Sequence, residues 1–259
     1  MNILQEIAIR TKKRIEDRKN VLPLRTLKEM VCSSDIAHDF AFEKALQSKE
    51  LSFICEVKRA SPSKGIIAED FPYTEIAKDY EAAGAAAISV LTEPYYFKGD
   101  DRYLREIADS MSIPLLRKDF TVDEYMIYEA KMLGASAVLL ICAILDRETL
   151  VKYLNIAHSL GLSALVEAHS EAEVDMALAV GARLIGVNNR NLKTFAVDIT
   201  LSERLRKMVP RDILFVAESG IQTAADINKL RQHGVDAVLV GETLMRVPDK
   251  KAALTKLRG

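Results

Sequence analysis

Charged and amide side chains stand where several apolar segments of the sequence end. They are Glu56 and Lys58 in FICEVKR (53–59), Lys118 in SIPLLRKD (112–119), Glu167 in GLSALVEA (161–168), and Asn188 and Arg190 at the end of and just after AVGARLIGVN (179–188). Lysine and glutamate act as general acids and bases, and inside a fold they are costly unless they are paired or used. Each one alone could be a buried ion pair, a snorkelling lysine or a helix cap. Six together predict one shared catalytic site.

The elements that must position these residues form an internal repeat. Four segments share a helix-ending glycine, a few small or polar residues and a short apolar run: AAGAAAISVL (82–91), MLGASAVLLI (132–141), AVGARLIGVN (179–188) and QHGVDAVLVG (232–241). Further runs in 53–59, 112–119, 161–168 and 211–220 bring the predicted strands to eight. The runs are almost continuously apolar, as in parallel strands covered on both faces, and helical stretches such as 147–160 separate them. This pattern predicts a (β/α)8 (TIM) barrel.

An open, doubly wound sheet is the alternative fold. It predicts a GxGxxG fingerprint after the first strand, and the sequence has none there. We therefore predict one domain over 1–259, with a helical extension in 1–50 and the barrel in 51–259. Because side chains alternate along a strand, Glu56 and Lys58 share one face while Cys55 lies on the other. The mouth at the C-terminal strand ends is then the expected site.

Two glycines follow the predicted seventh and eighth strands. Ser219-Gly220 precedes a helix that begins near Thr223, and Gly241 precedes one that begins at Glu242. Glycine followed by helix N-terminal amides in these two loops is the usual phosphate site of such a barrel, and two ordinary tight turns are the alternative. We predict the phosphate site, with the Glu242 carboxylate pointing away and its backbone N–H facing the ligand.

The first fifty residues predict helices over 2–19, 24–32 and about 40–48. In the first helix an apolar stripe lies opposite a basic face; the stripe comprises Ile3, Leu4, Ile7, Ala8, Thr11 and Ile15, and the face Arg10, Lys13, Arg14 and Arg18. Such a helix either lies on a membrane surface or packs on the barrel. Its modest hydrophobicity and lack of aromatic residues favour packing.

The composition indicates which kinds of binding partner and which cellular compartment to expect. Among 259 residues, 36 Lys and Arg face 37 Asp and Glu, a net charge of −1 without any single-sign block, so nucleic acid is not expected as a partner. The longest apolar run, 137–145, is too short to span a bilayer, and the N-terminus has charges where a signal peptide would be apolar. Three scattered cysteines favour a reducing cytoplasm over a disulfide framework. We therefore expect a cytoplasmic protein without a membrane partner.

Metal chemistry has little support in the sequence. The four histidines, His38, His158, His169 and His233, never pair at i, i+4, and no CxxC motif occurs. We expect no metal site. His169 shares the face of Glu167, so a contact with Glu167 is an alternative, but we expect His169 to cap the helix that follows.

Six segments together resemble indole-3-glycerol phosphate synthase: FICEVKRASPSKG (53–65), LLRKDF (115–120), ALVEAH (164–169), IGVNNRNL (185–192), VAESGI (216–221) and VGETLM (240–245). The first segment and NNRNL are the most specific. The resemblance implies ring closure of 1-(2-carboxyphenylamino)-1-deoxyribulose 5-phosphate, with loss of carbon dioxide and water, in tryptophan biosynthesis. It implies a small phosphorylated substrate and no metal or organic cofactor. We expect a monomer, with association with other tryptophan-pathway enzymes left open.

The resemblance also implies residue roles. Lys118 is the general acid at the carbonyl, Lys58 a second acid, Glu167 the base, and Glu56 orients the lysines. Asn188 and Arg190 hold hydroxyls and the carboxylate, Ser61 belongs to a flexible closing loop, and an apolar pocket for the aromatic ring comes from Pro62, Phe97, Phe120, Leu139 and Leu192. Ser219, Gly220, Gly241 and Glu242 take the phosphate.

Two other functions stay open at this point. The chain could be another phosphate-binding barrel enzyme, such as a sugar-phosphate isomerase or a Schiff-base aldolase, in which a lysine of lowered pKa is the nucleophile. It could also bind a phosphorylated ligand without catalysis.

Overall fold

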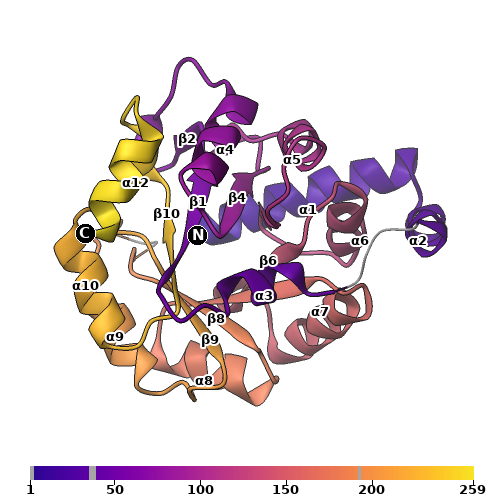
Figure 1. Cartoon of the computed structure of the whole chain (residues 1–259). Helices are drawn as coiled ribbons and strands as arrows, with labels where there is room; N and C mark the ends of the chain where they lie inside the picture. Colours follow the sequence, from indigo (N-terminus) through magenta and orange to yellow (C-terminus); the bar gives the residue numbers. More distant parts are fainter. Residues whose placement is uncertain (1–2, 35–38, 192–193) are drawn as a thin grey trace.

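A barrel of eight parallel strands forms the centre of the computed structural model, which describes residues 3–34, 39–191 and 194–259. The strands are β1 (Ser52–Val57), β4 (Ala87–Leu91), β5 (Leu115–Lys118), β6 (Ala137–Ile141), β7 (Ser163–Ala168), β8 (Leu184–Asn188), β9 (Leu214–Glu218) and β10 (Ala237–Val240). They follow one another around the ring in chain order, and β10 pairs with β1 (Figure 1). The predicted (β/α)8 barrel is confirmed, and because the ring is closed the open doubly wound sheet is wrong.

Helices cover the outside of the barrel. They are α4 (Tyr73–Ala82), α5 (Asp101–Ala108), α6 (Tyr125–Met132), α7 (Arg147–Ser159), α8 (Glu171–Ala179), α9 (Thr200–Arg206), α10 (Ala224–Gln232), α11 (Glu242–Met245) and α12 (Lys250–Arg258), with a 3-10 turn η1 (Cys142–Ile144) after β6. The loop after β1 contains a small antiparallel hairpin, β2 (Ala60–Ser61) and β3 (Gly65–Ile66). The four repeat glycines, Gly84, Gly134, Gly181 and Gly234, have φ between 74° and 86°, the left-handed conformation that ends a helix.

Alternation along the strands separates two cores. Side chains such as Ile54, Leu116, Leu165 and Leu239 point inward and fill the barrel, while their neighbours pack against the surrounding helices. The inward set continues to the C-terminal strand ends, where polar residues replace apolar ones. Register therefore decides which polar side chains reach the mouth.

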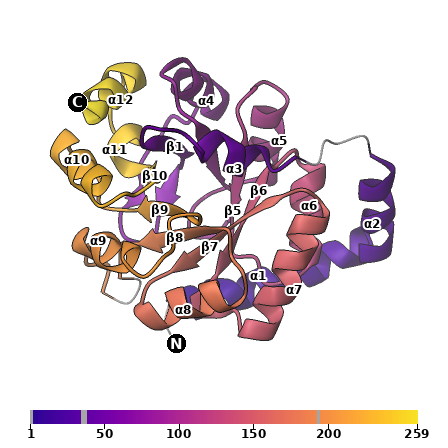
Figure 2. The same ribbon diagram turned by 60° about the horizontal axis from the view of Figure 1, so that its bottom comes forward.

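The N-terminal extension covers both ends of the barrel. It consists of α1 (Ile3–Val21), α2 (Leu24–Ser33) and α3 (Ala41–Leu46), close to the predicted helices. Figures 1 and 2 place α1 and α3 at opposite ends of the strands. The apolar stripe of α1 is buried, with Ile7 and Ile15 each 1% exposed, so the helix packs on the barrel as expected. Among the described residues, no helix combines the length and apolarity needed to cross a membrane.

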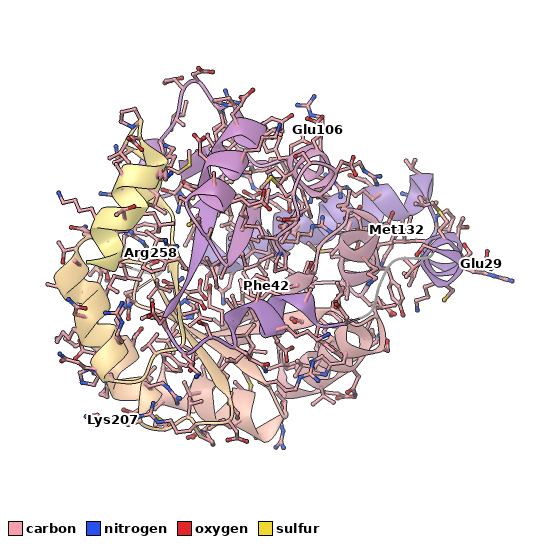
Figure 3. All side chains as sticks on the ribbon, viewed as in Figure 1. Glu29, Phe42, Glu106, Met132, Lys207 and Arg258 are labelled. Atoms are coloured by element: carbon pink, nitrogen blue, oxygen red, sulfur yellow. The ribbon has the colours of Figure 1, made fainter. Side chains whose placement is uncertain are left out.

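Helix α3 closes the N-terminal end. Phe42 is fully buried and Leu46 nearly so, and both belong to the core inside the barrel (Figure 3). The backbone N–H of Phe40 donates to the Gly161 carbonyl, 3.2 Å away, and that of Glu43 donates to Ser163 Oγ, 3.3 Å away. These contacts fix α3 to the beginning of β7.

Candidate active site

A cavity of about 850 Å³ opens at the C-terminal ends of the strands. Every predicted site residue within the described ranges lines it: Glu56, Lys58, Ser61, Pro62, Phe97, Lys118, Phe120, Leu139, Glu167, Asn188, Arg190, Ser219, Gly220, Gly241 and Glu242. Leu192 lies outside the described residues, as does His38. The structure thus brings residues from all eight strands and their following loops to one space.

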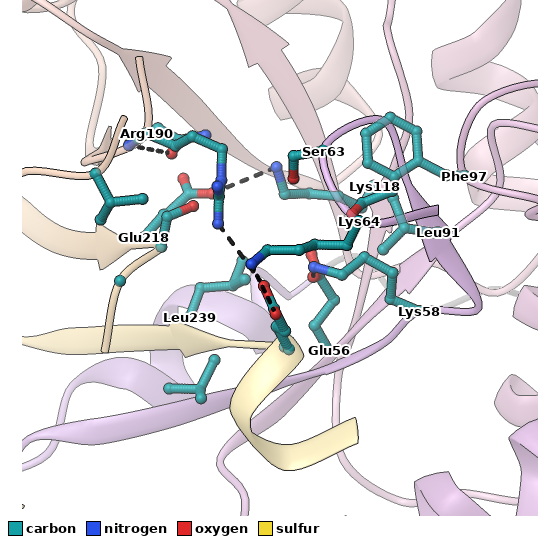
Figure 4. Close-up of a pocket in the computed structure, with 18 of the residues that line it drawn as sticks. Glu56, Lys58, Ser63, Lys64, Leu91, Phe97, Lys118, Arg190, Glu218 and Leu239 are labelled. Carbon is teal, nitrogen blue, oxygen red and sulfur yellow. Dashed lines mark hydrogen bonds and ion pairs between the residues drawn. The ribbon is translucent and has the colours of Figure 1, made fainter. Parts of the chain in front are cut away.

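Lys118 occupies the centre of the charged wall. Its Nζ lies 3.0 Å from Glu167 Oε2 and 3.3 Å from Glu218 Oε2. Both carboxylates are buried, while 13% of the Lys118 side chain is exposed to the cavity. Figure 4 shows Lys118 and Glu218 at this wall. Sequence analysis did not select Glu218. The signal was present, because Glu218 ends β9 on the same inward face as Val216, and the register places it beside Asn188.

The electrostatics of this group follow from one cation shared by two carboxylates. Burial alone would lower the pKa of Lys118, but the charges of Glu167 and Glu218 outweigh it and raise that pKa above its ordinary value. Burial would raise the pKa of Glu167, yet Lys118 and His169 hold it below its usual range. For Glu218 burial prevails over Lys118, and its pKa rises to about 7. Glu167 is then ionised near neutral pH, while Glu218 titrates there.

A second lysine–carboxylate pair lies on β1 and the residue that follows it. Lys58 Nζ donates a hydrogen bond to Glu56 Oε2. Gly241 lies against this pair, since a Cβ at that position would be 2.3 Å from Glu56 Oε2 and 2.8 Å from Lys58 Nζ. The absence of a side chain at Gly241 therefore makes room for the pair as well as for a ligand.

The expected phosphate side is built from turns. Ser219 and Gly220 both have positive φ, 66° and 84°, so two successive residues are left-handed. Successive backbone N–H groups in such a turn form a concave anion site. The N-terminus of α10 contributes less than expected, because the Asp226 carboxylate of its capping box accepts the N–H groups of Gln222 and Thr223.

The expectation that the Glu242 carboxylate points away is wrong. It lies at the cavity wall, 3.0 Å from Arg246 Nε, 3.5 Å from Lys64 Nζ and 3.9 Å from Arg190 Nη2. Burial would raise its pKa, but the bonds with Arg246 and Lys64 lower it. Three surrounding cations thus explain why a carboxylate is tolerated here. Lys64, on the loop that carries β2 and β3, was a further cavity residue that sequence analysis did not select.

The opposite wall is apolar. The rings of Phe97 and Phe120 lie 6.2 Å apart at 41°, and Figure 4 shows Phe97 and Leu91 across the space from Arg190 and Glu218. The fully buried Glu93 fixes this loop, since its Oε2 accepts the N–H of Phe97 at 3.0 Å.

Helix α1 completes the apolar wall. Ile3, Leu4 and Ile7 line the cavity from the N-terminal extension. The sequence indicated only that their stripe is buried. A planar aromatic group fits between such apolar walls, which lie beside a mouth rich in cations.

The expectation that His169 caps the following helix is wrong. Ser170, not His169, caps α8, because its side chain accepts the N–H of Glu173. His169 Nε2 lies 3.4 Å from Glu167 Oε1 instead. Among the described residues, no cluster of three or more His, Cys, Asp or Glu side chains has the arrangement of a metal site.

The fold and site define a (β/α)8 barrel whose cavity holds two lysine–carboxylate pairs beside a left-handed turn. Residues 4–257 match the family model for indole-3-glycerol phosphate synthase. The chain is 60% identical over 257 residues to indole-3-glycerol phosphate synthase of Ruminiclostridium cellulolyticum, and 50% identical over 256 residues to that of Endomicrobium trichonymphae. Each alignment covers 99% of both chains. The chain therefore belongs to the indole-3-glycerol phosphate synthase family.

Solved structures of other sequences share the barrel. A 3-hexulose-6-phosphate synthase from Salmonella typhimurium superposes with a TM-score of 0.65 at 14% identity, over 80% of this chain and 96% of that one. A thiamine phosphate pyrophosphorylase from Pyrococcus furiosus gives a TM-score of 0.59 at 20% identity, over 82% and 96%. At these identities the likeness concerns the fold alone.

Proposed function

We propose that this chain catalyses the reaction for which its family is named. It closes the indole ring of 1-(2-carboxyphenylamino)-1-deoxyribulose 5-phosphate to give indole-3-glycerol phosphate, carbon dioxide and water. The observation that carries the proposal is the pairing of two lysines with carboxylates, Lys118 with Glu167 and Lys58 with Glu56, in one cavity. Family membership indicates which reaction is catalysed, and the lysine and glutamate side chains of the cavity can act as acids and bases in its steps.

The first step needs positive charge at the ketone oxygen of the ribulose part. As the carboxylate-bearing ring carbon attacks that carbonyl carbon, negative charge develops on the oxygen, and the Lys118 ammonium stabilises and protonates it. Its raised pKa keeps Lys118 charged in the free site. The same property opposes Schiff-base chemistry, which needs a neutral amine.

The later steps release carbon dioxide and then water. Loss of carbon dioxide leaves its electron pair in the ring. Lys58 then donates a proton to the departing hydroxyl, and Glu167 removes a proton from the ring being formed, so one water leaves. Glu56 orients Lys58, and Glu218 shares the ammonium of Lys118 with Glu167. No metal or organic cofactor takes part.

Substrate binding divides between the two walls of the cavity. The aromatic ring packs among Pro62, Phe97, Phe120 and Leu139, and Leu192 is proposed to join them. Asn188 and Arg190 hold hydroxyls and the carboxylate, and the loop of Ser61 closes over the ligand. The phosphate binds at Ser219, Gly220, Gly241 and the backbone of Glu242.

A fluorescence assay tests the proposal. The sequence contains no Trp, so the indole product appears over a background of tyrosine alone. Purified chain should convert the substrate, and Lys118→Ala, purified in parallel, should not. Binding of substrate without turnover would instead support a non-catalytic phosphate-ligand binder. A covalent adduct after borohydride treatment with substrate would support a Schiff-base aldolase, and we expect none.

We also propose that the chain works as a monomer in the cytoplasm. Residues of this chain supply both the charged and the apolar walls of the cavity, which supports a site that functions in one copy. Light scattering on the active protein should give a mass near 28.8 kDa. A dimeric mass would contradict this part of the proposal.

A further inference from the structure

His169 follows β7 directly and lies two residues beyond Glu167, so both side chains lie on the same side of the backbone. Its ring is largely buried, with 15% of the side chain exposed. Nε2 lies 3.4 Å from Glu167 Oε1, and no hydrogen bond to any described residue satisfies it. This nitrogen therefore faces the carboxylate that we propose as the base.

The other side of the ring is held by Glu173, in the first turn of α8. Glu173 Oε2 accepts the backbone N–H of His169 at 2.8 Å and lies 3.3 Å from ring Nδ1. Two contacts from one carboxylate oxygen fix both the main chain and the ring of His169. The imidazole thus lies between the Glu173 carboxylate, which holds the ring, and the Glu167 carboxylate, which lines the cavity.

This geometry favours the charged form of the ring. A neutral imidazole has one N–H and would present a lone pair to one carboxylate, whereas an imidazolium donates to both. Burial alone would lower the pKa of His169, but Glu173 and Glu167 outweigh it and raise that pKa. The charged groups that act on the ring are Glu173 on α8, Glu167 on β7 and Glu218 on β9. Behind these carboxylates, Lys118 on β5 pairs with Glu167, and Cys142 on η1 lies near Glu173 and Glu167.

We propose that His169, held by Glu173, is a positioning residue for Glu167. The imidazolium holds Oε1 of Glu167, which leaves Oε2 facing Lys118 Nζ at 3.0 Å. Each oxygen of the base then has its own cation, so the carboxylate stays ionised and keeps one rotamer. The kinetic part of this inference rests on the proposed function of Glu167.

A proton titration tests the contact without any turnover. In protein labelled with nitrogen-15 histidine, the signal of His169 is assigned as the one missing from His169→Gln. It should titrate above the ordinary value of 6.5, and Glu167→Gln should lower its pKa by about one unit, as expected for loss of a nearby opposite charge. Glu173→Gln should lower it as well, and provides the measurement if Glu167→Gln does not fold. An unchanged pKa in the folded variants overturns the inference.

Kinetics test the positioning role. His169→Gln keeps an N–H donor but cannot become charged, so Glu167 loses one of the two cations that orient it, and kcat should fall about tenfold through poorer positioning of the base. KM should stay within about twofold, and the loss of activity as pH rises through the His169 pKa should disappear. His169→Ala should lose more than His169→Gln. An unchanged kcat and pH profile, or an effect on KM or thermal stability alone, overturns the proposal.

A matched variant controls for removing a histidine. His233 also lies near a glutamate, with Nε2 3.8 Å from Glu203, but at the end of α10 away from the cavity. His233→Gln should leave kcat and its pH profile unchanged, and a change equal to that of His169→Gln contradicts a specific role. If the titration shows the coupling while wild-type protein fails to convert the substrate, the proposed function is wrong and the contact between His169 and Glu167 stands.

Discussion

The two ends of the barrel are both covered by the N-terminal extension, but in opposite ways. At the N-terminal end, Phe42 and Leu46 of α3 fill the space completely. At the C-terminal end, Ile3, Leu4 and Ile7 of α1 form one wall of an open cavity whose other wall is charged. At the N-terminal end the apolar side chains of the extension pack against the core, whereas at the C-terminal end they face the cavity. Substitutions at the two ends should therefore separate stability from activity.

The largest expected effect is at the mouth. Lys118→Ala should lower kcat about a thousandfold, within the range for loss of a general acid, while substrate binding stays measurable. Lys118→Arg should fail too, because a guanidinium does not release its proton readily. The control is Lys152→Ala, which removes an exposed lysine paired with Glu124. A Lys118→Ala enzyme with a large share of wild-type kcat would remove Lys118 from its proposed role.

At the closed end, Phe42→Ala should act on stability instead. Removing a fully buried ring should lower the free energy of unfolding by about 3–5 kcal/mol. Phe42→Leu should cost less because it leaves a smaller cavity. Denaturant unfolding measures the loss, and kcat and KM of the folded fraction should equal the wild-type values. A fall in kcat would show that the two ends are not independent.

The phosphate turn should show an intermediate effect. Gly220→Asp places a carboxylate beside the turn proposed to receive a dianion, so KM should rise about ten- to a hundredfold. Gly220→Ala is the matched control, since its Cβ meets the same positive φ of 84° and the same 2.4 Å approach to Val197 Cγ1 without adding a charge. It should share the backbone strain without the rise in KM. Inorganic phosphate should compete with substrate in the wild type, and an equal KM in both variants would place the phosphate elsewhere.

The smallest expected effect concerns the wall formed by α1. Leu4→Ala should raise KM about fivefold, equivalent to roughly 1 kcal/mol of lost apolar contact. Leu27→Ala, in the buried cluster under α2, makes the same change away from the cavity and should lower stability only. If Leu4→Ala leaves KM unchanged, α1 contributes packing to the mouth but no contact with the ligand.

The sequence predicted the barrel because its repeat is local: each unit ends a helix with glycine and begins an apolar strand. The inward polar residues followed from strand parity, which applied equally to Glu218, although only its neighbours Ser219 and Gly220 were selected. The position of the Glu242 carboxylate did not follow, because Lys64 and Arg190 reach it from other loops. The sequence also did not predict which parts of the barrel α1 and α3 contact. An apolar stripe shows that a face is buried, and says nothing of which end of the barrel buries it.

The contacts of α3 also determine when it can dock as the chain is synthesised and folds. Glu43 bonds to Ser163, 120 residues later in the chain, and its carboxylate pairs with Arg183. During synthesis α3 therefore emerges long before β7 and β8, and its apolar side chains are not fully covered until these strands have formed. The segment translated early is among the last to dock. Its docking should be a late step in folding, and until then its apolar side chains are exposed to a chaperone.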